Sequence, residues 1–103
     1  MTNEQLHLMA TNNGNLRAAE CVEHSDNYGF AQILVSGDFG QYILDAALGS
    51  KTYYKTRVRI EVQGFQGEYE KRKAFSEGYA DVLKGLGVNV ITDSQIDDDD
   101  GFP

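Results

Sequence analysis

The sequence predicts an α+β fold, in which an antiparallel sheet of about four to five strands is covered by one amphipathic helix. Three features of the chain predict this fold. Short apolar stretches separated by turn residues occupy its first half, and a segment with a two-residue apolar period follows them. After Gly67 the apolar spacing changes to three and four residues, which is the spacing of a helix.

The first half of the chain is predicted to form an antiparallel meander. The stretches 15–24, 28–37 and 39–48 are short and apolar, and they contain many β-branched and aromatic residues. The turn sequences SDN and SGD lie between them. Residues 1–13 precede the meander, and their sequence fits either a short helix or a flexible arm.

Residues 52–64 show the clearest alternation in the sequence, and they are predicted to form a strand with one apolar and one polar face. The apolar face carries Tyr54, Val58, Ile60 and Val62. The polar face carries Tyr53, Lys55, Arg57, Arg59 and Glu61.

The next segment is predicted to form the helix that covers the sheet. Its apolar stripe consists of Phe75, Tyr79, Val82, Leu83 and Leu86. Glu68 and Glu70 lie in the first turn, where carboxylates interact favourably with the helix dipole, and Gly87 is placed to end the helix. Residues 88–92 then return as a last short strand.

The length of 103 residues supports one domain with a modest core. We expect residues 1–93 to form this domain and residues 94–103 to form a flexible acidic tail. Cys21 is the one cysteine, so the chain cannot form an internal disulfide. No segment fits a signal peptide or a membrane span, and we therefore expect a cytoplasmic protein without a membrane partner.

The residues that commonly carry catalysis occur here in no recognisable arrangement. His7 and His24 are the two histidines, and neither lies in a zinc-binding motif or beside a paired cysteine. Cys21 lies in an apparent strand, where a packed side chain is expected rather than a nucleophile. We therefore predict no catalytic residue, no metal site and no cofactor.

Charge is distributed unevenly along the chain, whose formal net charge is -7. Residues 1–50 contain one basic residue and six acidic ones, whereas residues 51–84 contain eight basic and five acidic residues. Residues 85–103 contain five acidic residues and no basic one. The chain is thus basic in its middle and acidic at both ends, and this pattern underlies two different functional hypotheses.

The polar face of the 52–64 strand is a candidate nucleic-acid-binding surface. Its alternate side chains stand about 6.6–6.8 Å apart, comparable with the phosphates of an extended single strand. An aromatic ring among cations can also stack a base. The candidate contacts, which extend onto the helix, are Tyr53, Lys55, Arg57, Arg59, Lys71, Arg72 and Lys73. The alternative is a solvated face whose cations pair with Glu20, Glu23 or Asp45.

The chain ends in the sequence DDDDGFP, and its candidate partner-binding residues are Asp97, Asp98, Asp99, Asp100 and Phe102. This end resembles the acidic C-terminal tip of bacterial and phage single-stranded-DNA-binding proteins. The resemblance implies a tip that docks on replication and repair proteins, with Phe102 in an apolar pocket and the aspartates against basic residues. Family tips usually end on Phe, whereas Pro103 follows it here, and the order of strands and helix differs from the family's barrel.

The favoured hypothesis is a small acidic interaction protein without enzymatic activity, which binds a protein with a basic surface. Such a protein would inhibit nucleic-acid-handling machinery as small phage and mobile-element inhibitors do. The alternative is a single-stranded nucleic-acid-binding protein with an acidic, partner-docking tail. A third hypothesis is an assembly protein that associates through exposed strand edges.

Overall fold

The computed structural model describes residues 1–22, 28–52 and 57–96. Its elements, in chain order, are α1 (Asn3–Glu20), β1 (Gly29–Val35), α2 (Gly37–Asp45), β2 (Ser50–Lys51), β3 (Val58–Glu61), a 3-10 turn η1 (Phe65–Gly67), α3 (Tyr69–Gly85) and β4 (Val90–Ile96).

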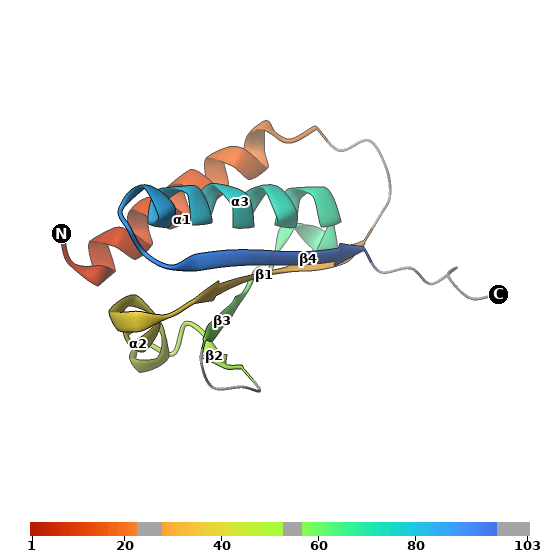
Figure 1. The fold of residues 1–103 in the computed structure, drawn as a ribbon. Coiled ribbons are helices and arrows are strands. Elements are labelled where there is room, and N and C mark those ends of the chain that lie inside the picture. The colour runs from red at the N-terminus through yellow and green to blue at the C-terminus, as the bar shows by residue number, and fades with distance from the viewer. Residues whose placement is uncertain (23–27, 53–56, 97–103) are drawn as a thin grey trace.

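The four described strands form one sheet in the order β2-β3-β1-β4, and every neighbouring pair is antiparallel. Helices α1 and α3 lie on one side of the sheet (Figure 1), and α3 packs directly against β1 and β4. This arrangement confirms the predicted α+β class. After α1, the element order β-α-β-β-α-β is that of a split βαβ motif.

The number of helices differs from the prediction, because the described residues contain three α-helices rather than one. The stretch 39–48 was expected as a strand, yet most of it lies in α2. Its apolar residues Phe39 and Ile43 are four positions apart and both are buried, so one helical face contacts the core. A short apolar run fits a strand and a buried helix equally well, and tertiary packing decides between them.

The stretch 15–24 was also expected as a strand, but α1 continues through Glu20. This helix begins with a capping box, in which Thr2 and Gln5 each bond to the backbone of the other. Its buried residues recur every four positions, at Leu6, Ala10, Gly14 and Ala18. The small size of three of these residues weakens the apolar signal in the sequence, which explains why the helix was not recognised at full length.

Three strand predictions are confirmed in part or in full. Residues 28–37 contain β1, residues 52–64 contain β3, and residues 88–92 contain the start of β4. Three residues of the predicted strand lie outside the described residues, namely Tyr53, Tyr54 and Lys55. β4 continues through Ser94, Gln95 and Ile96, which had been assigned to the tail.

The predicted helix is α3, although its apolar stripe is shorter than expected. Tyr79 and Leu83 are fully buried, Phe75 and Val82 are partly buried, and Leu86 lies beyond the end of the helix and is exposed. Gly87 follows with a φ of 83°, and its N–H donates to the carbonyl of Lys84 at 3.1 Å, as expected for a glycine that ends a helix.

The core lies between the sheet and its helices. Alternate residues of β1, namely Ala31, Ile33 and Val35, point into it. They pack in one cluster with Tyr79 and Leu83 of α3, together with residues of α1, α2, β3 and β4. The other residues of β1 therefore face away from the helices.

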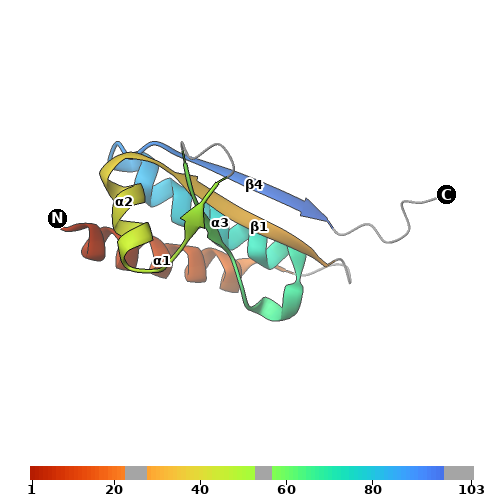
Figure 2. The ribbon, with the colours of Figure 1, turned by 90° about the horizontal axis from the view of Figure 1, so that it is seen from below.

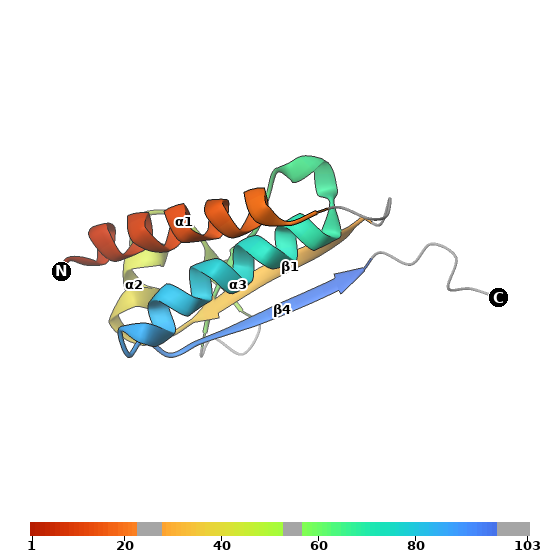
Figure 3. The ribbon, with the colours of Figure 1, turned by 90° about the horizontal axis from the view of Figure 1, so that it is seen from above.

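Helices α1 and α3 run side by side (Figure 3), and glycines allow their close approach. A Cβ atom at Gly14 would lie 2.8 Å from the carbonyl oxygen of Phe75, and one at Gly78 would lie 2.6 Å from Cγ of Arg17. Arg17 also forms an ion pair with Asp81 across this contact. The N-terminal helix is thus an integral layer of the domain rather than a flexible arm.

Candidate interaction surface

The face of the sheet turned away from the helices is called the outer face. Figure 2 views the molecule from this side. Side-chain alternation and the strand register place on it Phe30, Gln32, Leu34, Arg59, Glu61, Ile91, Asp93 and Gln95. Phe30 and Ile91 are 38% and 44% exposed. The outer face therefore combines exposed apolar groups with charged ones, a mixture typical of protein-binding surfaces.

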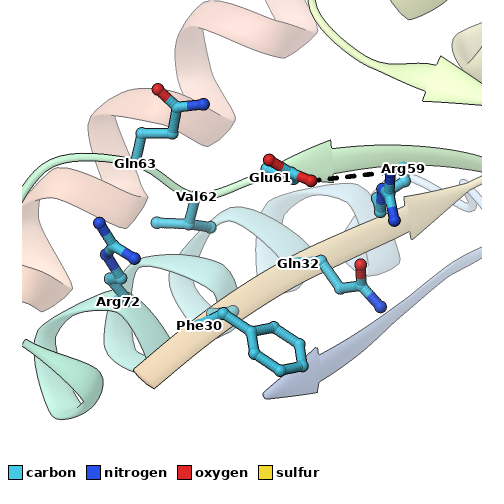
Figure 4. Close-up of a pocket in the computed structure, with 8 residues that line it drawn as sticks. Phe30, Gln32, Arg59, Glu61, Val62, Gln63 and Arg72 are labelled. Carbon is cyan, nitrogen blue, oxygen red and sulfur yellow. Dashed lines mark ion pairs between the residues drawn. The ribbon is translucent and has the colours of Figure 1, made fainter. Parts of the chain in front are cut away.

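A hollow of about 510 Å³ lies at one end of the outer face, where β1 and β3 approach α3 (Figure 4). It is lined by Phe30, Ala31, Gln32, Arg59, Glu61, Val62, Gln63 and Arg72. Two arginines from different elements thus share a hollow with an aromatic ring.

Arg59 is held loosely in this hollow. One terminal nitrogen lies 3.6 Å from Oε1 of Glu61, its neighbour on the same strand, and Figure 4 shows this pair. Among the described residues, Nε of Arg59 is a buried nitrogen without a hydrogen-bond partner. Glu20 and Asp45 are not its acidic partners, contrary to the alternative drawn from the sequence, and Glu23 lies outside the described residues.

The structure brings together only part of the predicted nucleic-acid-binding row. Tyr53 and Lys55 lie outside the described residues. Arg57 donates to Oδ1 of Asn89 at 3.5 Å, and it borders a separate hollow beside the start of α2. Arg59 therefore shares its hollow with Arg72 rather than with Arg57.

The three predicted cations of α3 have different surroundings. Nζ of Lys71 donates to the carbonyl oxygens of Ala18 and Cys21, both at 3.1 Å, and so closes the C-terminal end of α1. Arg72 donates to the carbonyls of Gly64 and Gly29 at 3.1 and 3.2 Å. Lys73 is exposed. Lys71 and Arg72 consequently hold the fold together.

Among the described residues, the exposed charged side chains are mostly acidic. The exposed basic residues are Arg17, Lys51, Lys73 and Lys84, while Arg57, Arg59, Lys71 and Arg72 are partly buried. The exposed acidic residues are Glu4, Glu20, Asp38, Asp45, Glu61, Glu77, Asp81 and Asp93. Four of the seven described cations in residues 51–84 are therefore partly buried, whereas eight of the ten described carboxylates are exposed.

A polar contact joins α1 to the buried side of α3. Nδ1 of His7 lies 2.7 Å from the hydroxyl of Tyr79, whose side chain is 1% exposed. His7 also contacts the ring of Tyr42 on α2. Burial lowers the pKa of His7 below its ordinary value of 6.5. Burial, with a smaller effect of Tyr42, raises the pKa of Tyr79. Both groups are thus neutral near pH 7, and the tautomer of the imidazole sets which of them donates the hydrogen bond.

The structure also bears on metal ligands, membrane-spanning helices and the residues Cys21 and His24. In the described part of the chain, no group of three or more histidine, cysteine, aspartate or glutamate side chains is placed to hold a metal ion. No helix among the same residues is both long and apolar enough to cross a membrane. Cys21 is partly buried at the C-terminal end of α1, and His24 lies outside the described residues.

The predicted partner-binding tail, Asp97 to Phe102, lies outside the described residues. Ile96 is the last residue of β4, and it pairs with Gly29. The carbonyl of Gly29 accepts a hydrogen bond from Arg72, which lines the hollow. Ile96, the last described residue, therefore lies at the end of the sheet where the hollow lies.

Comparison with known proteins places the chain in no family, since it matches no family model, no curated protein and no solved structure. Its function must accordingly be argued from its own residues.

Sequence reasoning identified Arg57 and Arg59 but missed the outer face on β1 and β4. The sequence of β1 indicates that Phe30, Gln32 and Leu34 share one face of a strand, because they occupy every second position. The sequence does not reveal the strand order, and without it these residues cannot be placed beside Arg59 and Asp93.

Proposed function

We propose that this protein is a small acidic interaction protein without enzymatic activity, which binds a protein with a basic surface in the cytoplasm. We further propose that its partner is part of the nucleic-acid-handling machinery, and that binding inhibits it as a phage or mobile-element inhibitor would. The observation that carries the proposal is the excess of exposed carboxylates over exposed cations among the described residues, to which the bonding of Lys71 and Arg72 to backbone carbonyls contributes.

The physical reason is electrostatic complementarity. Proteins that bind nucleic acid present clustered lysines and arginines, and an acidic surface attracts these clusters and competes with phosphates for them. Opposite net charges accelerate association, and salt screens the attraction. The sequence adds Asp97 to Asp100 and Phe102 as a further acidic and aromatic contact of the kind that its tip resemblance implies.

The direct test is capture of partners on the intact, immobilised chain from a nuclease-treated lysate at low salt. We expect basic nucleic-acid-binding proteins to be retained, to elute as salt is raised, and to lose affinity for DNA when complexed. Glu20→Gln combined with Glu77→Gln removes two exposed carboxylates and should weaken binding roughly 2- to 30-fold.

Lys73→Gln is the matched control, because it removes an exposed cation from α3 and should leave binding unchanged or strengthen it. The proposal fails if the chain retains oligonucleotides but no basic protein, or if neutralising the carboxylates has no effect on capture.

A second candidate function is supported by the hollow, in which Phe30 lies with Arg59 and Arg72. Four-stranded sheets of other small domains stack single-stranded bases on aromatic side chains, and each stacked base contributes about 1–3 kcal/mol. If this function holds, Phe30→Ala and Arg59→Glu should both weaken oligonucleotide binding, and Arg59→Glu should also lower its salt dependence. Glu61 and Asp93 on the same face repel phosphates, which makes this the weaker candidate.

A further inference from the structure

The two edges of the sheet are built differently. β2, at one edge, has two residues, whereas β4, at the other, has seven. Proteins commonly protect an edge strand by keeping it short or by placing proline, lysine or a bulge in it. β4 has the sequence VITDSQI, which contains neither proline nor lysine, and its register with β1 is continuous from Val90 to Ile96. The β4 edge is thus long and regular.

The direction of the β4 backbone groups follows from one hydrogen bond. The N–H of Val62 donates to the carbonyl of Ala31 at 3.0 Å, so the backbone groups of Ala31 point toward the β3 side. In an antiparallel sheet these directions alternate along a strand, and those of Gln32 therefore point toward β4. The backbone groups of its partner Asp93 point back toward Gln32.

By the same alternation, every second residue of β4 points its N–H and C=O groups out of the sheet, namely Val90, Thr92, Ser94 and Ile96. The side chains of these residues lie on the helix side, because Thr92 pairs with Ile33, which belongs to the core. A second β4 can join this edge only with its own outward-pointing residues facing them. The helices of both copies then lie on the same side of one joined sheet.

The single charge on β4 selects the register of such a pairing. Asp93 is the one charged residue of the strand. With the two strands fully overlapped, Asp93 would lie directly opposite its own counterpart, where like charges destabilise the pair. With Ser94 opposite its counterpart instead, Asp93 faces Gln95 of the second copy. Its carboxylate already accepts a hydrogen bond from Gln32 at 3.0 Å, and it has lone pairs for a second donor.

The same register brings an exposed apolar side chain to a hollow. A hollow of about 220 Å³ lies between β4 and α3, and Thr92 and Lys84 belong to its lining. Ile96 is 41% exposed at the end of the strand. Ile96 of the second copy would face Thr92 on the helix side, where the threonine methyl group and the aliphatic stem of Lys84 can contact it. The two-fold axis repeats this contact at both ends of the seam.

We infer that the β4 edge binds a second copy of this chain, with a two-fold axis at Ser94 and one continuous sheet across both copies. The outward backbone groups of Thr92, Ser94 and Ile96 bond to those of the second copy. An unrelated strand would offer the backbone bonds alone, whereas a second copy adds the Asp93–Gln95 and Thr92–Ile96 pairs. The inference is independent of the proposed function. Both outer faces lie on one side of the dimer, so a partner of this face would meet two of them at once.

Sedimentation of the full chain over a range of concentrations tests the association. We expect a reversible dimer whose fraction rises with protein concentration. Each copy carries a net charge of -7, which opposes association, so raising the salt from about 0.05 M to about 0.5 M should strengthen the dimer. Capture of basic proteins should respond to salt in the opposite direction.

Cysteine cross-linking tests the register. Ser94→Cys places two thiols on residues whose Cα atoms are about 5.5 Å apart across the two-fold axis, which suits a disulfide. Thr92→Cys is the matched control, because its two Cα atoms would be about 14 Å apart, too far for a disulfide. Under mild oxidation we expect a covalent dimer from Ser94→Cys. Thr92→Cys and the wild type should give only the background of Cys21.

A backbone variant tests the hydrogen bonds of the seam. Thr92→Pro removes an outward N–H from each copy and leaves the bonds to β1 intact, so it should raise the dissociation constant of the dimer about tenfold or more. Thr92→Val retains that N–H and should dimerise as the wild type does. Circular dichroism verifies that both variants fold, and the cross-linking result decides if Thr92→Pro does not.

The inference is overturned if the full chain sediments as a monomer at every salt concentration up to about 1 mM protein, a limit weaker than any specific dimer. It is equally overturned if Thr92→Cys cross-links as readily as Ser94→Cys, or if folded Thr92→Pro dimerises as tightly as Thr92→Val. A monomer that still captures basic proteins would leave the proposed function standing. A dimer that captures none would support the seam and contradict the proposed function.

Discussion

His7 is the described residue at which pH is expected to act on the fold. Its imidazole shares a hydrogen bond with Tyr79, which is buried in the core, and its pKa is lowered by burial. The unfolded chain therefore binds a proton at His7 more readily than the folded chain does. Linkage then requires the free energy of unfolding to rise with pH, and the contribution of His7 is lost as pH falls below 6.5.

We predict that the protein is less stable at about pH 5.5 than at about pH 7.5, and that His7→Gln reduces this difference. Glutamine favours a helix and carries an oxygen that can accept from Tyr79, so the variant should remain folded at both pH values. Urea unfolding at the two pH values measures the difference. An unchanged pH dependence in His7→Gln would show that another group is responsible.

At the scale of elements, the contact between α1 and α3 depends on two glycines. We predict that Gly78→Ala destabilises the protein by about 1–3 kcal/mol, because the added Cβ would lie 2.8 Å from the backbone oxygen of Asn13. This cost exceeds the gain of about 1 kcal/mol that alanine brings to a helix. Thermal and urea unfolding would measure it.

Gly85→Ala is the matched control for this prediction. Gly85 also belongs to α3, but a Cβ atom there would meet nothing within 4 Å. The substitution should leave stability unchanged or raise it by up to about 1 kcal/mol. Equal effects of the two substitutions would mean that α1 does not pack on α3 as closely as described.

The elements also show how far sequence reasoning reaches. β1 was predicted because it lies in a short apolar stretch bounded by turn residues, β3 because its apolar residues alternate, and α3 because its apolar residues recur at helical spacing. α2 was not predicted, because nine residues with Phe39 and Ile43 on one face resemble a strand until the packing is known. The composition of the outer face depends on strand order, and this order arises from contacts between residues far apart in the chain.

At the scale of the whole molecule, accessible charge distinguishes the two candidate functions. The net charge of -7 repels a polyanion, and two cations of the basic middle, Lys71 and Arg72, are partly buried and bonded to backbone carbonyls. Nucleic-acid binding needs several accessible cations, because each phosphate contact releases counterions that contribute to affinity. Outside the hollow of Arg59 and Arg72, the described surface exposes Arg17, Lys51, Lys73 and Lys84, and Arg17 is already paired with Asp81.

We therefore predict that a labelled single-stranded oligonucleotide binds neither the full chain nor a chain ending at Ile96 at low salt, as measured by fluorescence anisotropy. Removing Asp97 to Pro103 takes away four of the sixteen acidic residues, which gives a latent basic site its best chance to bind. Tighter binding by the shortened chain would favour the nucleic-acid function and give the tail a competing role. If neither chain binds the oligonucleotide, the result supports the proposed function, in which the acidic surface binds a basic protein.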